Sequence, residues 1–259
     1  MGVLNITPDS FFDGGQYSGV EHAVQQALQM EAAGAKIIDV GGESTRPGAA
    51  DVSLIEELDR ILPVIEGIRK KSDILISIDT SKAQVMRDAV GAGANIINDI
   101  RALREPGAME AAASLNVPVC LMHMQGQPRT MQSNPVYGNV LQEVLAFLLV
   151  RAEQCIAQGI NKQNIWFDPG FGFGKTVDHN LSLLKHLDQF VETGFPILVG
   201  MSRKSMLGAI LNVPVENRLA GSLALATAAC LKGAAIIRVH DVEETVHVVK
   251  VVEALNGAE

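Results

Sequence analysis

The sequence predicts a single-domain (β/α)8 barrel over residues 1–259. Short apolar runs alternate with amphipathic helical stretches along the whole chain. Segments 34–39, 93–98 and 233–238 each repeat a Gly-Ala-x-Ile-Ile-polar pattern, in which a glycine that ends a helix precedes a buried strand. Because this repeating unit implies parallel strands, eight of them in ~250 residues favour a (β/α)8 barrel. A doubly wound open sheet is the alternative.

The expected elements follow from hydrophobic periodicity. Strands are expected at 1–5, 35–40, 74–79, 95–98, 117–122, 163–168, 196–200 and 234–239. Helices are expected near 20–33, 52–71, 82–91, 105–115, 139–158, 178–192, 203–211, 216–232 and 241–255. Asp241 with Glu244 is a plausible capping pair for the last helix. No linker or low-complexity segment divides the chain, which indicates one domain.

Composition limits the partners and the compartment. The chain has 21 basic and 29 acidic residues, a net charge of −8, so general binding to nucleic acid or to an acidic membrane is not expected. Cys120, Cys155 and Cys230 lie far apart in apolar surroundings, as core residues of a reducing compartment do. No apolar run approaches the ~20 residues of a membrane span. A soluble, cytoplasmic protein is expected.

The segment Ile165–Lys175 is the most informative stretch of the sequence. An apolar run ends at Asp168, Pro169 stops the strand, and three alternating glycines follow. A nucleotide P-loop is excluded, because the glycine it needs five residues before Gly174 is replaced by Pro169. The segment therefore predicts a strand that delivers Asp168 to the edge of a sheet. The glycines predict a loop whose backbone approaches a ligand closely. A structural β-turn with an exposed Asp is the alternative.

Polar groups recur where the predicted strands end. They are Asn5, Asp39, Asp79, Asn98, His123, Asp168, the Ser202-Arg203-Lys204 segment, Arg238 and His240. A barrel places the C-terminal ends of its strands, and the loops after them, on one catalytic face. One rim should therefore gather these side chains into a site.

Two kinds of chemistry are expected at this rim. Asp79, Asn98 and Asp168 suit a flat heterocycle that carries several N–H groups, although each Asp alone could instead cap a helix or pair with a lysine. A second group is basic and suits an anion; it comprises Arg46, Arg203, Lys204, Arg238 and His240. Asn5 and the Ser202 helix start could add neutral donors to it.

Further features of this rim come from its strand and loop sequences. Strand alternation predicts that Arg238 and His240 point to the same side. Loops 6–19 and 41–52 are long and glycine-rich, as mobile covers over a site are. Loop 124–137 receives no role, and no His/Cys cluster has zinc-site spacing.

Seven blocks of sequence resemble the dihydropteroate synthase family, the folate-pathway enzymes targeted by sulfonamides. They are 5–15 (NITPDSFFDGG), 39–48 (DVGGESTRPG), Asp79-Thr80, Asn98-Asp99, 168–175 (DPGFGFGK), Ser202-Arg-Lys-Ser205 and Arg238-Val-His240. The likeness runs from residue 1 to about residue 255. One departure is that the chain begins inside the expected first strand, so an upstream segment that closes the barrel bottom is expected to be missing.

The resemblance implies the joining of 7,8-dihydropterin-6-ylmethyl diphosphate to 4-aminobenzoate, with release of diphosphate. It implies that the pterin is held by Asp79, Asn98, Asp168 and Lys204. It implies a diphosphate site of Asn5, Arg46, Arg238 and His240, with Asn5 also a ligand of Mg²⁺. It implies a 4-aminobenzoate pocket of Thr45, Arg46, Pro47, Phe173, Lys204 and Ser205. A homodimer is implied by the resemblance alone.

The expected mechanism is dissociative. Charge on the departing diphosphate would be neutralised by Mg²⁺ and the basic residues, and Asp13 would stabilise the methylene cation that remains. The neutral arylamine then needs orientation more than a base. A pterin-binding methyltransferase and a catalytically silent pterin-binding paralogue are the alternatives. The first would not need Arg238, His240 or the 202–205 segment, and the second would be expected to have lost Asn5, Asp13, Thr45 and Arg46.

Overall fold

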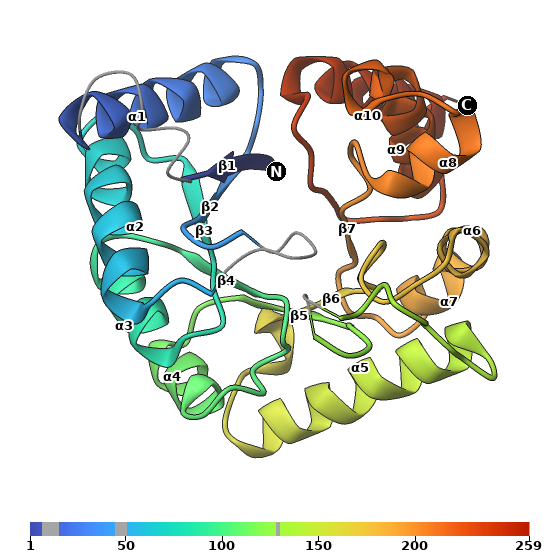
Figure 1. Ribbon diagram of the computed structural model, residues 1–259, viewed down its shortest axis with the longest axis horizontal. Coiled ribbons are helices and arrows are strands. Elements are labelled where there is room, and N and C mark those ends of the chain that lie inside the picture. The colour runs from blue at the N-terminus through green and yellow to red at the C-terminus, as the bar shows by residue number, and fades with distance from the viewer. Residues whose placement is uncertain (7–15, 45–50, 128–129, 259) are drawn as a thin grey trace.

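The computed structural model describes residues 1–6, 16–44, 51–127 and 130–258, and its strands surround one axis with helices outside them (Figure 1). The strands are β1 (Gly2–Asn5), β2 (Ile37–Gly41), β3 (Leu75–Asp79), β4 (Ile96–Asp99), β5 (Val119–Met122), β6 (Ile165–Asp168), β7 (Leu198–Val199) and β8 (Ile236–Ile237). The helices are α1 (Gln16–Ala32), α2 (Leu54–Arg69), α3 (Ala83–Gly91), α4 (Ala108–Leu115), α5 (Val140–Ala157), α6 (Val177–Lys185), α7 (Leu187–Val191), α8 (Ser205–Leu211), α9 (Leu219–Leu231) and α10 (Val242–Asn256).

The strands close into a ring. β1 to β6 pair in sequence order, all parallel, and β7 pairs with β8 in the same sense. Two parallel bridges, Phe167 with Ile197 and Gly2 with Val239, join the two sheets at both edges. The second bridge includes the bond from the Val3 N–H to the Val239 carbonyl, 2.9 Å long. The (β/α)8 barrel is thus confirmed, and the open-sheet alternative is wrong.

The three repeated glycines end their helices in the same way. Gly34, Gly93 and Gly233 have φ angles of +103°, +117° and +88°, which favour glycine. The alanine after each glycine donates its N–H to the carbonyl five residues earlier, over 2.9–3.0 Å. This is the hydrogen bond of a Schellman motif, which reverses the chain into the next strand. The repeat therefore encodes one helix-to-strand turn used three times.

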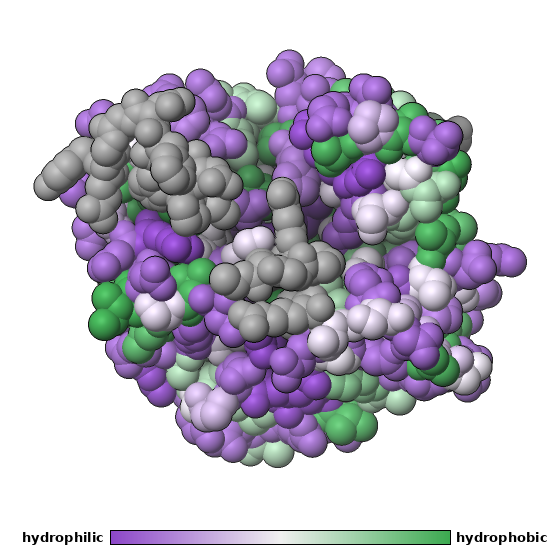
Figure 2. All heavy atoms as spheres, viewed as in Figure 1, coloured by the Kyte–Doolittle hydropathy of each residue, from purple (hydrophilic) through white to green (hydrophobic). Residues whose placement is uncertain are grey.

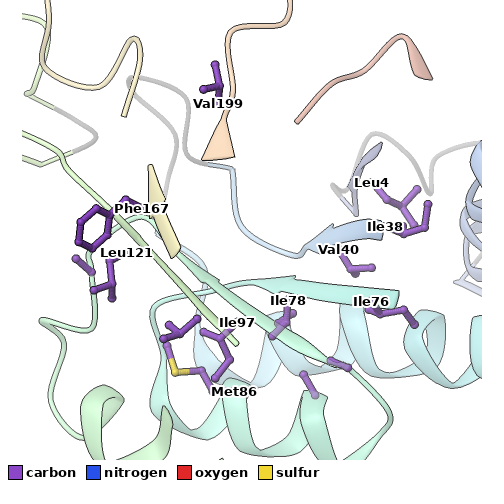
Figure 3. Packing of buried hydrophobic residues seen from close by; sticks show 14 of the residues in the cluster. Leu4, Ile38, Val40, Ile76, Ile78, Met86, Ile97, Leu121, Phe167 and Val199 are labelled. Carbon is purple, nitrogen blue, oxygen red and sulfur yellow. The ribbon is translucent and has the colours of Figure 1, made fainter. Parts of the chain in front are cut away.

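Alternation along the strands separates the core from the site. Ile38 and Val40 of β2, with Ile76 and Ile78 of β3, belong to the apolar cluster between sheet and helices (Figure 3). Asp39 lies between two of these residues in sequence and therefore points to the opposite side, into the barrel. A continuous apolar layer thus supports the strands from outside while leaving their inner face available for polar groups.

Three local predictions differ from the structure. The helix expected at 178–192 is broken at His186, whose ψ of 31° separates α6 from α7. The last two strands are shorter than predicted, and β8 ends at Ile237. Asp241 makes no side-chain cap for α10 because its carboxylate accepts from Arg203 instead, with Nε 2.9 Å from Oδ2. No helix in the described ranges has the length and apolar character of a membrane span.

Candidate active site

Buried polar side chains gather at the C-terminal ends of the central strands. Those with less than a tenth of their surface exposed include Asp39, Asp79, Asn98, Asp99, His123 and Asp168. Asp79 lies directly opposite Asn98 in the β3–β4 register. The parallel order of the strands thus brings residues far apart in sequence to one rim, as the sequence predicts.

Arg238 connects β8 to the carboxylates of β2 and β3. Its Nε donates to Asp39 Oδ2 over 2.6 Å, and its Nη2 donates to Asp79 Oδ2 over 2.9 Å. Asn98 Nδ2 also donates to Asp39 Oδ2, over 3.1 Å. The other oxygen of the fully buried Asp39, Oδ1, has no hydrogen-bond partner among the described residues. An orphaned buried acceptor of this kind is suited to a ligand that brings an N–H group.

This arrangement shifts the pKa values of its members. Burial, reinforced by Asp39, raises the pKa of Asp79 to about 8. Burial would lower the pKa of Arg238, but Asp39 and Asp79 outweigh it and raise that pKa. One guanidinium can neutralise only one of the two carboxylates, and Asp79 is the carboxyl group whose protonated form is favoured. Burial also raises the pKa of Asp168, against the opposing charge of Lys204.

Lys204 and Phe173 meet on the other side of the rim. The Lys204 ammonium lies 4.6 Å from the centroid of the half-buried Phe173 ring and donates to the Phe171 carbonyl. Burial lowers the pKa of Lys204 to about 8, although Asp168 opposes the shift. A cation over an aromatic face beside a buried carboxylate suits an aromatic acid or a heterocycle.

The glycines after Asp168 let their loop pack closely against neighbouring segments of the protein. Gly170, Gly172 and Gly174 have φ angles of +71°, +80° and +62°. A Cβ on Gly170 would lie 1.9 Å from the His123 carbonyl oxygen, and one on Gly174 would lie 2.6 Å from the Gln125 carbonyl oxygen. At Gly170 and Gly174 the close approach is therefore to protein atoms, and the approach of this loop to a ligand stays a prediction. Asp168 is buried and its Oδ1 accepts from the Gly170 N–H over 2.7 Å, so the β-turn with an exposed Asp is wrong.

Loop 124–137, which received no role from the sequence, supports this glycine loop. Tyr137 donates its hydroxyl to the Gly174 carbonyl over 2.8 Å, and Gln132 donates to the Gly172 carbonyl. Met124 and Met131 are buried in a small apolar cluster against which Phe173 packs. The sequence could not reveal this support, because it depends on contacts between segments about 40 residues apart.

The predicted basic residues have different partners. Arg203 is half exposed and pairs with Asp241, while His240 is exposed and its Nδ1 lies 3.0 Å from Ser202 Oγ. β8 ends at Ile237, but Val239 continues the β pairing through its parallel bridge with Gly2, so the prediction that Arg238 and His240 point to the same side is not contradicted. Ser205 is exposed at the first position of α8.

Of the remaining predicted site residues, Asn5 is described by the structure and four others are not. Asn5 is exposed at the end of β1, where Gly41 of β2 is its register partner. The Asn5 side-chain amide oxygen is a type of ligand that Mg²⁺ binds. The protein itself needs to provide few other ligands when the substrate phosphates provide the rest. The described residues hold no group of three or more His, Cys, Asp or Glu side chains placed for a metal. Asp13, Thr45, Arg46 and Pro47 lie outside the described residues.

A cleft of about 530 Å³ opens beside Asp79. Its lining includes Glu43, Glu57, Thr80, Lys82 and Arg101, from the segments that follow β2, β3 and β4. It makes Asp79 reachable from outside the barrel, in keeping with a rim that receives a small molecule.

The comparisons with known proteins agree with this geometry. Residues 1–240 match the family model described as pterin binding enzyme. The dihydropteroate synthase of Haemophilus influenzae is 55% identical over 258 residues, which cover 100% of this chain and 94% of that protein. The chain belongs to the dihydropteroate synthase family.

Solved structures of the family have the same fold. The Yersinia pestis dihydropteroate synthase in complex with a sulfonamide drug superposes with a TM-score of 0.95 at 54% identity, covering 100% of this chain and 94% of that one. The Xanthomonas albilineans dihydropteroate synthase with 4-aminobenzoic acid gives a TM-score of 0.94 at 46% identity, with 100% and 93% covered.

Sequence reasoning gave no role to three residues that the structure places at the site. The sequence identified Asp39 and His123 only as polar residues at strand ends. It identified Lys175 only as the end of the 165–175 segment, which does not form a P-loop. The signal that could have found Asp39 was its position between Ile38 and Val40, since a carboxylate in a fully buried strand needs a partner.

Replacing Gly170 by Ala should destabilise the protein more than the same change at Gly194. Gly194 has a similar φ of +78° but no atom within 4 Å of an added Cβ, so it controls for backbone strain alone. We expect Gly194→Ala to lower the free energy of unfolding by about 1–2 kcal/mol and Gly170→Ala by about 2 kcal/mol more, from overpacking. Urea unfolding measures both, and equal losses would contradict the close contact with His123.

Asp79→Asn should change the pH dependence of stability. The folded protein holds a proton on Asp79 between its ordinary pKa of about 4 and its raised pKa of about 8, whereas the unfolded chain does not. Stability from this group is therefore lost as pH rises through that window. Asn does not titrate, so the Tm of the variant minus that of the parent should rise by about 3 °C or more from pH 5 to pH 8. A difference independent of pH would show that Asp79 is ionised throughout.

Proposed function

We propose that the chain joins 7,8-dihydropterin-6-ylmethyl diphosphate to 4-aminobenzoate, forming 7,8-dihydropteroate and diphosphate in folate biosynthesis. The observation that carries this proposal is one rim on which Asp79, Asn98 and Asp168 are buried within reach of two cations, Arg238 and Lys204. The family membership established above supports the same reaction.

The pterin would bind at Asp79, Asn98, Asp168 and Lys204. Buried acceptors that face a flat heterocycle form charge-assisted hydrogen bonds with its N–H groups, and such bonds are about twice as strong as neutral ones. Asp39, with its orphaned oxygen, adds an acceptor beside them.

The diphosphate would bind at Asn5, Arg46, Arg238 and His240. A guanidinium has five N–H donors, and the bonds of Arg238 to Asp39 and Asp79 use two of them. Its other donors can therefore meet phosphate oxygens without release of the carboxylates. Asn5 would hold Mg²⁺ together with the substrate, and the ion would supply positive charge to the leaving diphosphate.

The 4-aminobenzoate would occupy a pocket of Thr45, Arg46, Pro47, Phe173, Lys204 and Ser205. Phe173 and Lys204 support this assignment, because a ring face with a cation beside it suits an aromatic carboxylate. We propose that sulfonamides compete for this pocket, since the Yersinia pestis relative is solved with a sulfonamide drug.

The reaction would proceed by dissociation. The bond between the pterin methylene carbon and the diphosphate oxygen breaks, and its electron pair leaves with the oxygen. Arg238 and His240 stabilise the charge that grows there, while Asp13 stabilises the methylene cation. The aminobenzoate nitrogen then attacks the carbon and loses one proton to solvent, with Lys204 helping to orient both rings.

Neither rival function accounts for all of these features. A pterin-binding methyltransferase has no need of the Lys204–Phe173 pair or of cations for a diphosphate. A silent paralogue has no need of Asn5 and Arg238 together.

The cysteines support a cytoplasmic location, because Cys120, Cys155 and Cys230 are all free thiols.

Diphosphate release should depend on both Mg²⁺ and 4-aminobenzoate when the purified chain is given pterin diphosphate. Absence of release with active substrate would overturn the proposal.

The same assay tests whether Asp13 stabilises the methylene cation. Asp13→Asn should lower turnover by about 100-fold and leave the affinity for pterin diphosphate within a few-fold. Unchanged turnover would remove Asp13 from the mechanism.

A homodimer would form through the helices at the end of the chain. Val251 and Leu255 lie one turn apart on α10 and are 68% and 61% exposed, and Leu231 of the neighbouring α9 is 52% exposed. Figure 2 shows hydrophobic residues among hydrophilic ones over the region of α8 to α10. Exposed apolar side chains that share one helix face can form a subunit contact.

Light scattering should therefore give twice the chain mass for the parent protein. It should give the single mass for Val251→Glu combined with Leu255→Glu, because two carboxylates would be buried at the contact. Glu253→Gln, on the same exposed helix, is the control and should leave the mass unchanged. A double variant that keeps the doubled mass would place the contact elsewhere.

A further inference from the structure

The loop at 170–174 is held by side chains through all of its carbonyl groups. Gly170 and Phe173 accept from Lys175 Nζ over 2.9 and 3.0 Å. Gly174 accepts from Tyr137 over 2.8 Å. The Phe171 carbonyl accepts from Lys204, and the Gly172 carbonyl from Gln132. A loop without helix or strand thus has a defined shape because side-chain donors replace the missing backbone partners.

Lys175 is the buried centre of this arrangement. Only 3% of its surface is exposed. Besides the two loop carbonyls, its Nζ lies 3.0 Å from His123 Nδ1 and 3.3 Å from the His123 carbonyl oxygen. Two of these acceptors lie in the loop that follows β6, and the other two belong to His123, the residue after β5. One ammonium group therefore fastens two neighbouring segments of the rim together.

The surroundings of Lys175 fit an ammonium group that holds structure. Burial, followed by the charge of Lys175, lowers the pKa of His123 to about 3, so the imidazole is neutral and its Nδ1 lone pair can accept. Burial lowers the pKa of Lys175 to about 7, while Asp168 opposes that shift. The four acceptors within 3.3 Å of Nζ also favour the charged form, and this geometry decides for the ammonium. An ammonium has three N–H donors and meets four acceptors here, so none is left for a substrate.

Because its donors are all used by protein acceptors, Lys175 has no part in catalysis. Its position nevertheless affects Phe173, which belongs to the proposed 4-aminobenzoate pocket. Phe173 contributes its carbonyl to Lys175 and its ring to the contact with Lys204. Loss of the ammonium would leave carbonyls of Gly170, Phe173 and His123 buried with fewer donors, and the loop would have to move to hydrate them. Asp168 would be less affected, since it is the last residue of β6 and is paired in register with Met122 of β5.

We propose that Lys175 is a positioning residue, the internal cation around which the 170–174 loop folds and which sets Phe173 against Lys204 for 4-aminobenzoate. The substrate part of this inference rests on the proposed function. The structural part, in which Lys175 shapes the loop, stands on the contacts alone.

Lys175→Met tests the proposal, because Met has a similar length and no N–H donor. We expect the KM for 4-aminobenzoate to rise about tenfold or more, as a displaced positioning residue does. The KM for pterin diphosphate should rise much less, since Asp79, Asn98 and Asp168 lie on strands outside the loop. Hydrogen–deuterium exchange of the 170–174 amides should become faster. Lys185→Met, an exposed lysine of α6, is the matched control and should leave all three quantities unchanged.

Two outcomes would overturn the proposal. One is an equal rise in both KM values, and the other is unchanged KM values with unchanged exchange in the loop. If the Met variant does not fold, Lys175→Leu, which also lacks an N–H donor, is measured against the same criteria. Failure of the proposed function is separate: the parent chain would then release no diphosphate, while the exchange experiment would still test Lys175.

Discussion

The ion bridge of Arg238 with Asp39 and Asp79 is the interaction on which the rest of the site depends. It joins the last strand to the second and third, so it forms only in a closed barrel. It also places one positive charge between two buried carboxylates that would otherwise repel each other. Removing Arg238 would leave the buried Asp39 carboxylate without its cation, a change that costs several kcal/mol in general.

The fold was predictable because its signals are local. A glycine after an apolar helix, followed by Ile-Ile and a polar residue, specifies the same turn at Gly34, Gly93 and Gly233. The polar strand ends were predictable for a related reason, since parallel strands bring their C-terminal ends to one rim. Where the local signal was weak, the prediction was wrong: His186 breaks a helix that periodicity continues, and β8 stops before Arg238.

The arrangement within the rim depends on long-range contacts and could not be predicted in the same way. The sequence placed Arg238 with His240, whereas its guanidinium pairs with residues 159 and 199 positions away. The glycines of 170–174 predicted a close approach to a ligand, whereas the atoms nearest to a Cβ on Gly170 or Gly174 belong to the chain after β5. Family resemblance supplied roles for Asp13, Thr45, Arg46 and Pro47, which lie outside the described residues.

A crystal structure with a pterin and diphosphate bound would show whether one rim holds both groups. We expect the pterin edge between Asp79, Asn98 and Asp168, with phosphate oxygens on Arg238 while that residue still contacts Asp39. A pterin seated elsewhere, such as in the cleft beside Lys82, or a diphosphate that does not touch Arg238, would contradict it.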